Sequence, residues 1–196
     1  MMGLMAATAT AQNIVQNGSF SGGTLAPWTQ TQWGVGTFPP TDGGAQPAGT
    51  TFAAALECTG AGCNDPTTGA TLKQTLATTP GQTYTLTFAY DAGAHSGIET
   101  TILQVYWNGA LVSGGAITNA AASTWGQYSF SVTATGASTV LEFTGRQDPG
   151  AALYLTNISV DPQPSFSPIP GTLLLELLGM GSVLAYLAWR RMSRQF

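Results

Sequence analysis

The chain has 196 residues, which is enough for one domain of ordinary size with tails at its ends. Only 7% of the residues are charged, against about 25% in an average soluble domain, while 43% are hydrophobic. This balance excludes an acidic disordered chain. There are five basic residues, three of them among the last seven, so we expect no nucleic-acid partner. The many Gly and Thr residues favour an all-β protein outside the cytoplasm.

The N-terminal segment, residues 1–11, is predicted to be the remnant of a signal peptide. It is small and apolar and ends in Ala9-Thr10-Ala11, a pattern that signal peptidases cleave, with Gln12 as the first mature residue. The basic start and longer apolar run of a full signal peptide are missing. A frayed terminus of small residues is therefore the alternative.

Residues 12–161 are predicted to form one β-sandwich domain. Polar and apolar side chains alternate along short segments, as in strands with one buried face. The weaker strand candidates cover residues 13–20, 28–33, 51–57 and 71–77, and the stronger ones cover residues 84–90, 102–107, 127–132, 140–144 and 153–160. Asn108-Gly109 supplies a tight hairpin turn. Eight to ten strands without a helix indicate an antiparallel sandwich.

The C-terminal part is predicted to be a linker followed by a membrane helix. Residues 162–170 are rich in Pro and Ser and should be extended. Residues 171–189 are apolar apart from Glu176 and long enough to cross a bilayer, and the basic residues that follow agree with the positive-inside rule. We therefore expect residues 171–189 to span a membrane, as part of a C-terminal tail that covers residues 171–196. A buried core helix is the alternative.

This tail resembles a PEP-CTERM sorting signal. The residues that carry the resemblance are Pro168, Pro170, Gly171, Arg190 and Arg191. The chain departs from the family pattern at Ile169, where the family has Glu, and at Glu176 inside the helix. The resemblance implies processing by an exosortase-like enzyme in a Gram-negative bacterium. The precursor would be anchored in the inner membrane before delivery to the cell surface or extracellular matrix, and a plain membrane anchor is the alternative.

The domain itself resembles galactose-binding-like jelly rolls, a group that contains many carbohydrate-binding modules. The matching segments are residues 13–20 followed by Trp28-Thr29, residues 72–76 and 79–88, residues 105–109 and residues 153–160. Several members hold a structural calcium ion with carboxylates at positions occupied here by Ser21, Thr156 and Asn157. Because these replacements are neutral, we predict no metal and no cofactor.

Cys58 and Cys63 enclose a short Gly-containing segment and predict a disulfide loop in an exported protein. His95 is the only histidine, which disfavours metal binding. No sequence motif fixes the geometry of a Ser-His-Asp triad that would include His95, and the nucleophile motif of such enzymes is missing. Carboxylate pairs such as Asp91 with Glu99, or Glu57 with Asp65, leave a small glycoside hydrolase as a remote alternative.

Aromatic residues are the stronger indication of function, because their rings stack on the apolar faces of sugars while polar neighbours bind the hydroxyl groups. The aromatic candidates near strand ends are Trp33, Phe38, Tyr90, Trp107 and Trp125. The polar candidates are Asp91, His95, Arg146, Gln147 and Asp148, of which Arg146 and Asp148 could instead pair with each other. We expect Trp28 in the core, and Trp33 and Trp125 on the surface.

These features predict an exported, non-enzymatic protein that binds a polysaccharide of the cell surface or matrix. The ligand-binding residues would be Trp33, Tyr90, Asp91, His95, Trp125, Arg146 and Asp148. The alternative is a structural or adhesive biofilm-matrix protein that acts through protein–protein contacts. An exposed aromatic strip favours the first function, and an open sheet edge favours the second.

Overall fold

The computed structural model describes residues 12–37, 47, 50–56, 58, 62–63, 65, 69–92, 101–118, 124–147 and 153–164. The chain divides into two units, Met1–Gln163 and Pro164–Phe196. The segments predicted as signal peptide and transmembrane tail lie outside the described residues. Within the described part of the chain, no helix has the length and hydropathy needed to cross a bilayer.

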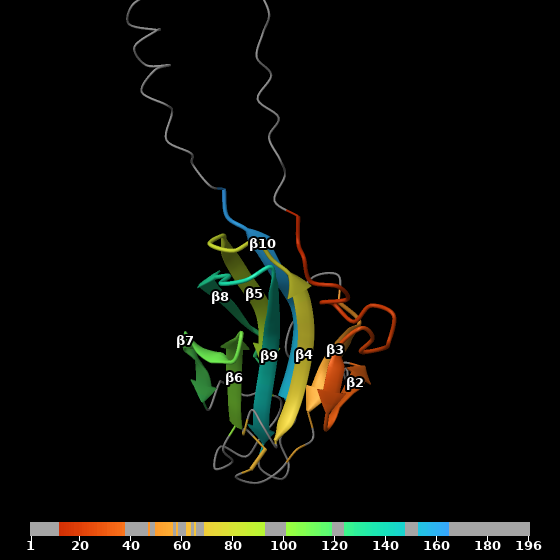
Figure 1. Ribbon diagram of the computed structural model, residues 1–196. Coiled ribbons are helices and arrows are strands. Elements are labelled where there is room, and N and C mark those ends of the chain that lie inside the picture. The colour runs from red at the N-terminus through yellow and green to blue at the C-terminus, as the bar shows by residue number, and fades with distance from the viewer. Residues whose placement is uncertain are drawn as a thin grey trace, which may run out of the picture. The chain divides into compact units, whose positions relative to one another are not determined.

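The described residues of the first unit form two five-stranded sheets (Figure 1), in agreement with the eight to ten strands that the sequence predicts. Sheet I has the order β1 (Thr29–Thr31), β4 (Ala70–Ala77), β9 (Ser138–Gln147), β6 (Thr101–Trp107) and β7 (Ala110–Thr118). Sheet II has the order β2 (Trp33–Thr37), β3 (Phe52–Leu56), β10 (Leu153–Pro162), β5 (Thr83–Asp91) and β8 (Gly126–Thr133). All pairs are antiparallel. The prediction of an all-β antiparallel sandwich is therefore confirmed.

The strands form where apolar and polar residues alternate, because one face of each sheet is buried against the other. In β6, for example, Leu103 and Val105 are fully buried, while the residues between them are partly exposed. Phe88 of sheet II meets Phe143 of sheet I edge to face at 5.3 Å between ring centroids. The predicted core residue Trp28 is 5% exposed and packs on Phe143 at 6.2 Å.

The predicted strand over residues 13–20 is not present. The segment contains turns, with Asn17 and Phe20 at positive φ. The Asn13 carboxamide oxygen accepts hydrogen bonds from the backbone N–H groups of Val15 and Val160, both at 2.9 Å. These side-chain bonds, with backbone bonds from Ile14 to Val160 and from Ile158 to Gly18, hold the segment beside β10 without a regular ladder.

The described ends of the first unit lie together at one end of the sandwich (Figure 1). There the Ile14 N–H donates to the Val160 carbonyl at 3.0 Å, and the Gln163 N–H donates to Thr83 at 2.9 Å. We call the opposite end, where β5 ends at Asp91 and β8 begins at Gly126, the distal end. The loops that were predicted to hold ligand residues start from strands that end there.

Candidate functional site

Two predicted ligand residues at the distal end are in the core instead. Trp33 is 3% exposed and lies across from Leu56 in the register of β2 and β3. Tyr90 is 1% exposed. The prediction that Trp33 lies on the surface is wrong, because its strand turns that side chain inward while its neighbours Gly34 and Gln32 are exposed. Neither ring is accessible to a ligand.

Burial also determines the chemistry of Tyr90. Desolvation is the main cause that raises the pKa of its hydroxyl above the ordinary value, and the polar side chain of Thr101 nearby acts in the opposite direction. The nearby charges of Tyr128 and Asp91 raise the pKa further. Tyr90 therefore remains neutral at all ordinary pH values, buried near the end of β5.

Asp91 and Trp125 are brought together by the structure. The Thr124 N–H donates to the Asp91 carboxylate at 3.2 Å, which fixes the chain just before β8 to the end of β5. Trp125 directly precedes Gly126, the register partner of Tyr90, so it lies beside Asp91. Asp91 is 4% exposed, whereas Trp125 is half-buried. The carboxylate is thus a positioning group for a partly exposed indole.

Tyr154 joins these residues on the outer face of sheet II, and sequence reasoning missed it. It pairs in register with Asp91 on one side and with Ala55 on the other, and Ala55 pairs with Gly34. We call Gly34, Ala55, Tyr154, Asp91 and Trp125 the distal row. The only sequence signal for Tyr154 is its outward position in a strand whose inward residues are aliphatic.

Small residues leave room along this row. The Tyr154 ring lies over Gly36, where an added Cβ would come within 3.2 Å of it. A Cβ added at Gly34 would meet no described atom within 4 Å. Tyr154 is half-buried, so part of its ring faces outward over a surface of Gly and Ala. A flat aromatic platform of this kind can accept the apolar face of a sugar.

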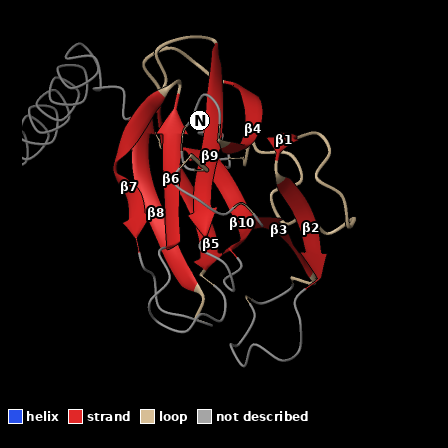
Figure 2. Ribbon diagram, turned by 90° about the horizontal axis from the view of Figure 1, so that it is seen from below, coloured by secondary structure: helices blue, strands red, loops and turns tan. Residues whose placement is uncertain are grey.

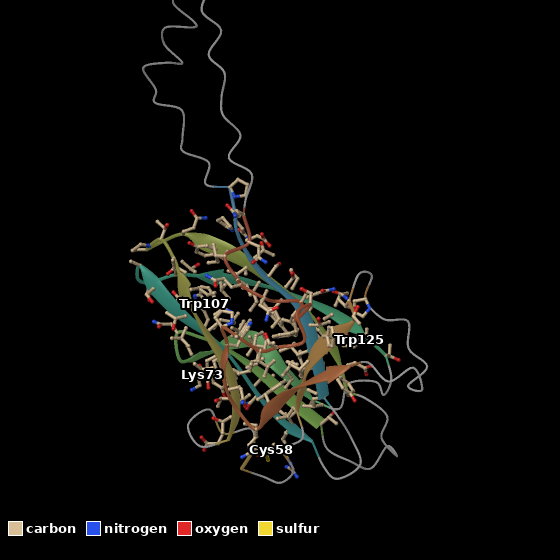
Figure 3. The ribbon with its side chains drawn as sticks, turned by 90° about the vertical axis from the view of Figure 1, so that its right-hand side faces the viewer. Cys58, Lys73, Trp107 and Trp125 are labelled. Carbon is tan, nitrogen blue, oxygen red and sulfur yellow. A yellow bond between two sulfur atoms is a disulfide. The ribbon has the colours of Figure 1, made fainter. Side chains whose placement is uncertain are left out.

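Arg146, another predicted ligand residue, lies on a different surface. It pairs in register with Ile102 in sheet I and faces outward, away from sheet II. The other basic residue of the domain, Lys73, lies on the same outer face, where its Nζ is 3.0 Å from the Glu142 carboxylate. Figure 3 shows Lys73 and Trp125 on opposite sides of the sandwich. The predicted residues His95 and Asp148 lie outside the described residues.

The outer face of sheet I carries a second row of side chains in register. Thr29, Lys73, Glu142, Tyr106 and Leu111 lie side by side across its five strands. Desolvation, with the charges of Glu142 and Asp65, raises the pKa of the Tyr106 hydroxyl. Glu142 is only 6% exposed, and Thr144 in the next row is completely buried. Most polar groups of this face therefore interact with other groups of the protein.

Cys58 and Cys63 form a disulfide with 5.7 Å between their Cα atoms, at the distal end (Figure 3). The Cys63 carbonyl accepts a hydrogen bond from the Ala70 N–H at 2.7 Å, which ties the loop to the start of β4. Gly69 lies so close to the carbonyls of Cys63, Asp65 and Gly62 that a side chain would not fit. The disulfide thus fixes the loop beside sheet I.

Metal ligands and a pocket are the other features of the described residues that bear on ligand binding. No three His, Cys, Asp or Glu side chains gather there as metal ligands would. A pocket of about 240 Å³ is lined by Gln16, Pro27, Thr29, Lys73, Gln74 and Thr75. The Gln74 side chain in it bonds both the N–H and the carbonyl of Gln16 at 2.8 Å. This polar lining serves to attach the N-terminal segment to β4.

No protein-family model and no curated protein sequence matches the chain. Solved structures with a similar fold do exist. One is TmCBM61, in complex with β-1,4-galactotriose, with a TM-score of 0.56 and 14% sequence identity. The match covers 78% of this chain and 100% of that module.

A second similar structure is the CBM22-1 xylan-binding domain of Xyn10C from Paenibacillus barcinonensis. It has a TM-score of 0.56 and 15% identity, and the match covers 82% of this chain and 100% of that domain. A third is the enzymatically active domain of tailspike protein 4 from bacteriophage CBA120, with a TM-score of 0.51 and 18% identity. That match covers 77% of this chain but only 21% of the tailspike chain. These likenesses concern the fold alone, which is a jelly-roll β-sandwich.

Proposed function

We propose that the protein is a non-enzymatic carbohydrate-binding module that binds a polysaccharide through the distal row. The observation that carries the proposal is the order of Trp125, just before β8, Asp91 on β5 and Tyr154 on β10. It places two partly exposed aromatic rings on one outer face, on either side of a buried carboxylate. Rings arranged in this way offer stacking surfaces, and the carboxylate holds one of them in place.

The spacing of the row suits a chain of several sugars. Neighbouring strands are about 4.8 Å apart, so residues on β10 and β8, with β5 between them, are about 10 Å apart at the backbone. A linear oligosaccharide of a few units spans that distance. Aromatic rings also stack without losing many rotamers, which makes them effective in shallow sites that bind polymers.

The fold agrees with this function. TmCBM61 was solved with a galactotriose, and the CBM22-1 domain is named for xylan. Both are binding modules whose whole length matches this chain, which supports binding over catalysis. The sequence adds the proposal of export, with an exosortase-like enzyme acting on the tail at residues 168–191. The polysaccharide would then belong to the cell surface or the extracellular matrix.

The test compares the two outer faces. The intact chain is titrated with soluble β-1,4-galactan, xylan and the polysaccharide of the host matrix, by calorimetry and affinity electrophoresis. Trp125→Ala and Tyr154→Ala should each weaken binding about tenfold or more, because aromatic residues at a binding centre contribute about 2 kcal/mol. Tyr106→Ala, which removes a half-buried Tyr from sheet I, should leave binding unchanged.

Each outcome separates one explanation from another. Loss of binding in Tyr106→Ala alone would move the site to the outer face of sheet I. Absence of binding to every polymer would reject the carbohydrate function and favour the adhesive alternative. Release of reducing ends from any polymer would revive the glycoside hydrolase.

A further inference from the structure

β8 is the longest regularly paired edge strand in the described part of the molecule. Four strands end the two sheets: β1, β7, β2 and β8. β1 has three residues and β2 has five. β7 is longer but irregular, with a register shift opposite β6 and Gly114 at φ 75°. β8 pairs regularly with β5 over all eight of its residues.

The sequence of β8 has none of the usual protection of an edge strand. Proteins prevent unwanted pairing with Lys, Pro, bulges or very short strands. The residues Gly126–Thr133 read GQYSFSVT, with no charge and no proline. Gln127, Ser129 and Ser131 are exposed along it. Figure 2 shows β8 at one side of the sandwich, next to β7 of the other sheet.

The backbone hydrogen bonds just beyond β8 show which of its groups face away from β5. Ala134, just beyond the strand, donates to Gln82 at 3.0 Å and accepts from Gly81 at 2.8 Å. Residues in an antiparallel pair alternate between bonding to the partner and facing away. Hence Gln127, Ser129, Ser131 and Thr133 turn their N–H and C=O groups to the outer edge. Consistently, the Thr133 carbonyl accepts from the Trp107 indole at 3.0 Å.

We propose that β8 pairs antiparallel with β8 of a second copy of this chain, with Ser129 opposite Ser129 on a two-fold axis. Gln127 then lies opposite Ser131 twice, and each of the three pairs exchanges two N–H···O bonds. A register centred on Ser131 would need the Thr133 carbonyl, which is already bound to Trp107. A register centred on Gln127 would need Trp125, which lies outside the strand.

The side chains fit the same register. Tyr128 and Phe130 lie on the inner side of β8, partly buried, and both stack on Phe88, at 5.4 Å and 5.9 Å. In the proposed pair Tyr128 of each copy lies opposite Phe130 of the other, at a position where side chains approach most closely. Aromatic pairs of this kind stabilise neighbouring strands. The result is one continuous ten-stranded sheet, and a dimer with two distal rows.

Cysteine cross-linking of the intact chain tests the register directly, because both natural cysteines are already joined in a disulfide. In Ser129→Cys the two Cα atoms would be about 5.5 Å apart, within disulfide range. Most of this variant should run as a reducible covalent dimer after mild oxidation. In the matched control Ser131→Cys, the two sites are offset by four residues, about 13 Å, and should not cross-link.

A second variant tests the hydrogen bonds without disturbing the fold. Proline is tolerated at an edge position whose N–H faces outward, so Ser129→Pro should keep the melting behaviour of the original chain. It should weaken dimerisation in sedimentation velocity by about tenfold or more, because both copies lose a donor. The proposal is overturned if Ser129→Cys stays monomeric, if Ser131→Cys cross-links equally well, or if Ser129→Pro dimerises as the original chain does.

Discussion

Replacing Trp33 and Trp125 by alanine should have opposite consequences, although both residues look alike in the sequence. Trp33 is 3% exposed, and its ring approaches the position of a Cβ on Gly145 to 3.4 Å. Trp125 is half-buried beside Asp91. We expect Trp33→Ala to lower the free energy of unfolding and Trp125→Ala to lower only the affinity for glycan.

The magnitude follows from the burial. A buried Trp removes about 150–250 Å² from water, worth about 4–6 kcal/mol at about 25 cal/mol per Å². The Trp33 indole N–H has no hydrogen-bond partner among the described residues, which offsets about 1–3 kcal/mol of this. These two terms leave about 1–5 kcal/mol, and the cavity left by the ring brings the expected loss to about 3–5 kcal/mol, the usual range for such truncations. For a domain of this size that lowers Tm by about 6–20 °C.

Differential scanning calorimetry of the intact chain, with glycan titration well below the transition, measures both effects. Trp33→Phe serves as the matched control, because it keeps most of the ring and removes the unpaired N–H, so its Tm should fall by only a few degrees. Trp125→Ala should melt within about 2 °C of the original chain. A Trp33→Ala protein with unchanged Tm and lost binding would refute the assignment of Trp33 to the core.

Three further changes test other parts of the structure. Gly145→Ala should destabilise the protein by about 1–3 kcal/mol in urea unfolding, since its Cβ would collide with Leu56; an unchanged midpoint would contradict the packing. Tyr90→Phe should be more resistant to alkali. Because burial raises the pKa of Tyr90 in the folded state, its contribution to the free energy of unfolding is fully present below about pH 10 and falls by about 1.4 kcal/mol per pH unit above it. Melting of both proteins at pH 8 and pH 11 should therefore show a smaller loss for Tyr90→Phe. Equal losses would refute this reasoning. Lys73→Met should cost about 1–2 kcal/mol by leaving the buried Glu142 carboxylate unpaired, and Glu142→Gln added to it should recover part of that loss.

The candidate site illustrates what short-range patterns can and cannot predict. Asp91 and Trp125 were both selected from the sequence as neighbours of strand ends, and the structure places them together. Tyr154 was not selected, because its role depends on lying between β3 and β5 in the sheet. Arg146 was grouped with them, yet it faces outward from the other sheet. Residues 91, 125 and 154 are too far apart in the chain for any local pattern to connect them.

The sequence by itself determined most of the strands, though not the absence of one over residues 13–20, and it determined the hairpin at Asn108-Gly109 and the all-β class, because alternation and turn chemistry act over a few residues. Only the tertiary structure decided strand order, the burial of Trp33 and the assembly of the distal row. It also decided that β8 ends a sheet and turns Ser129 outward. Those properties depend on long-range pairing, in which a shift of one residue moves every side chain to the opposite face.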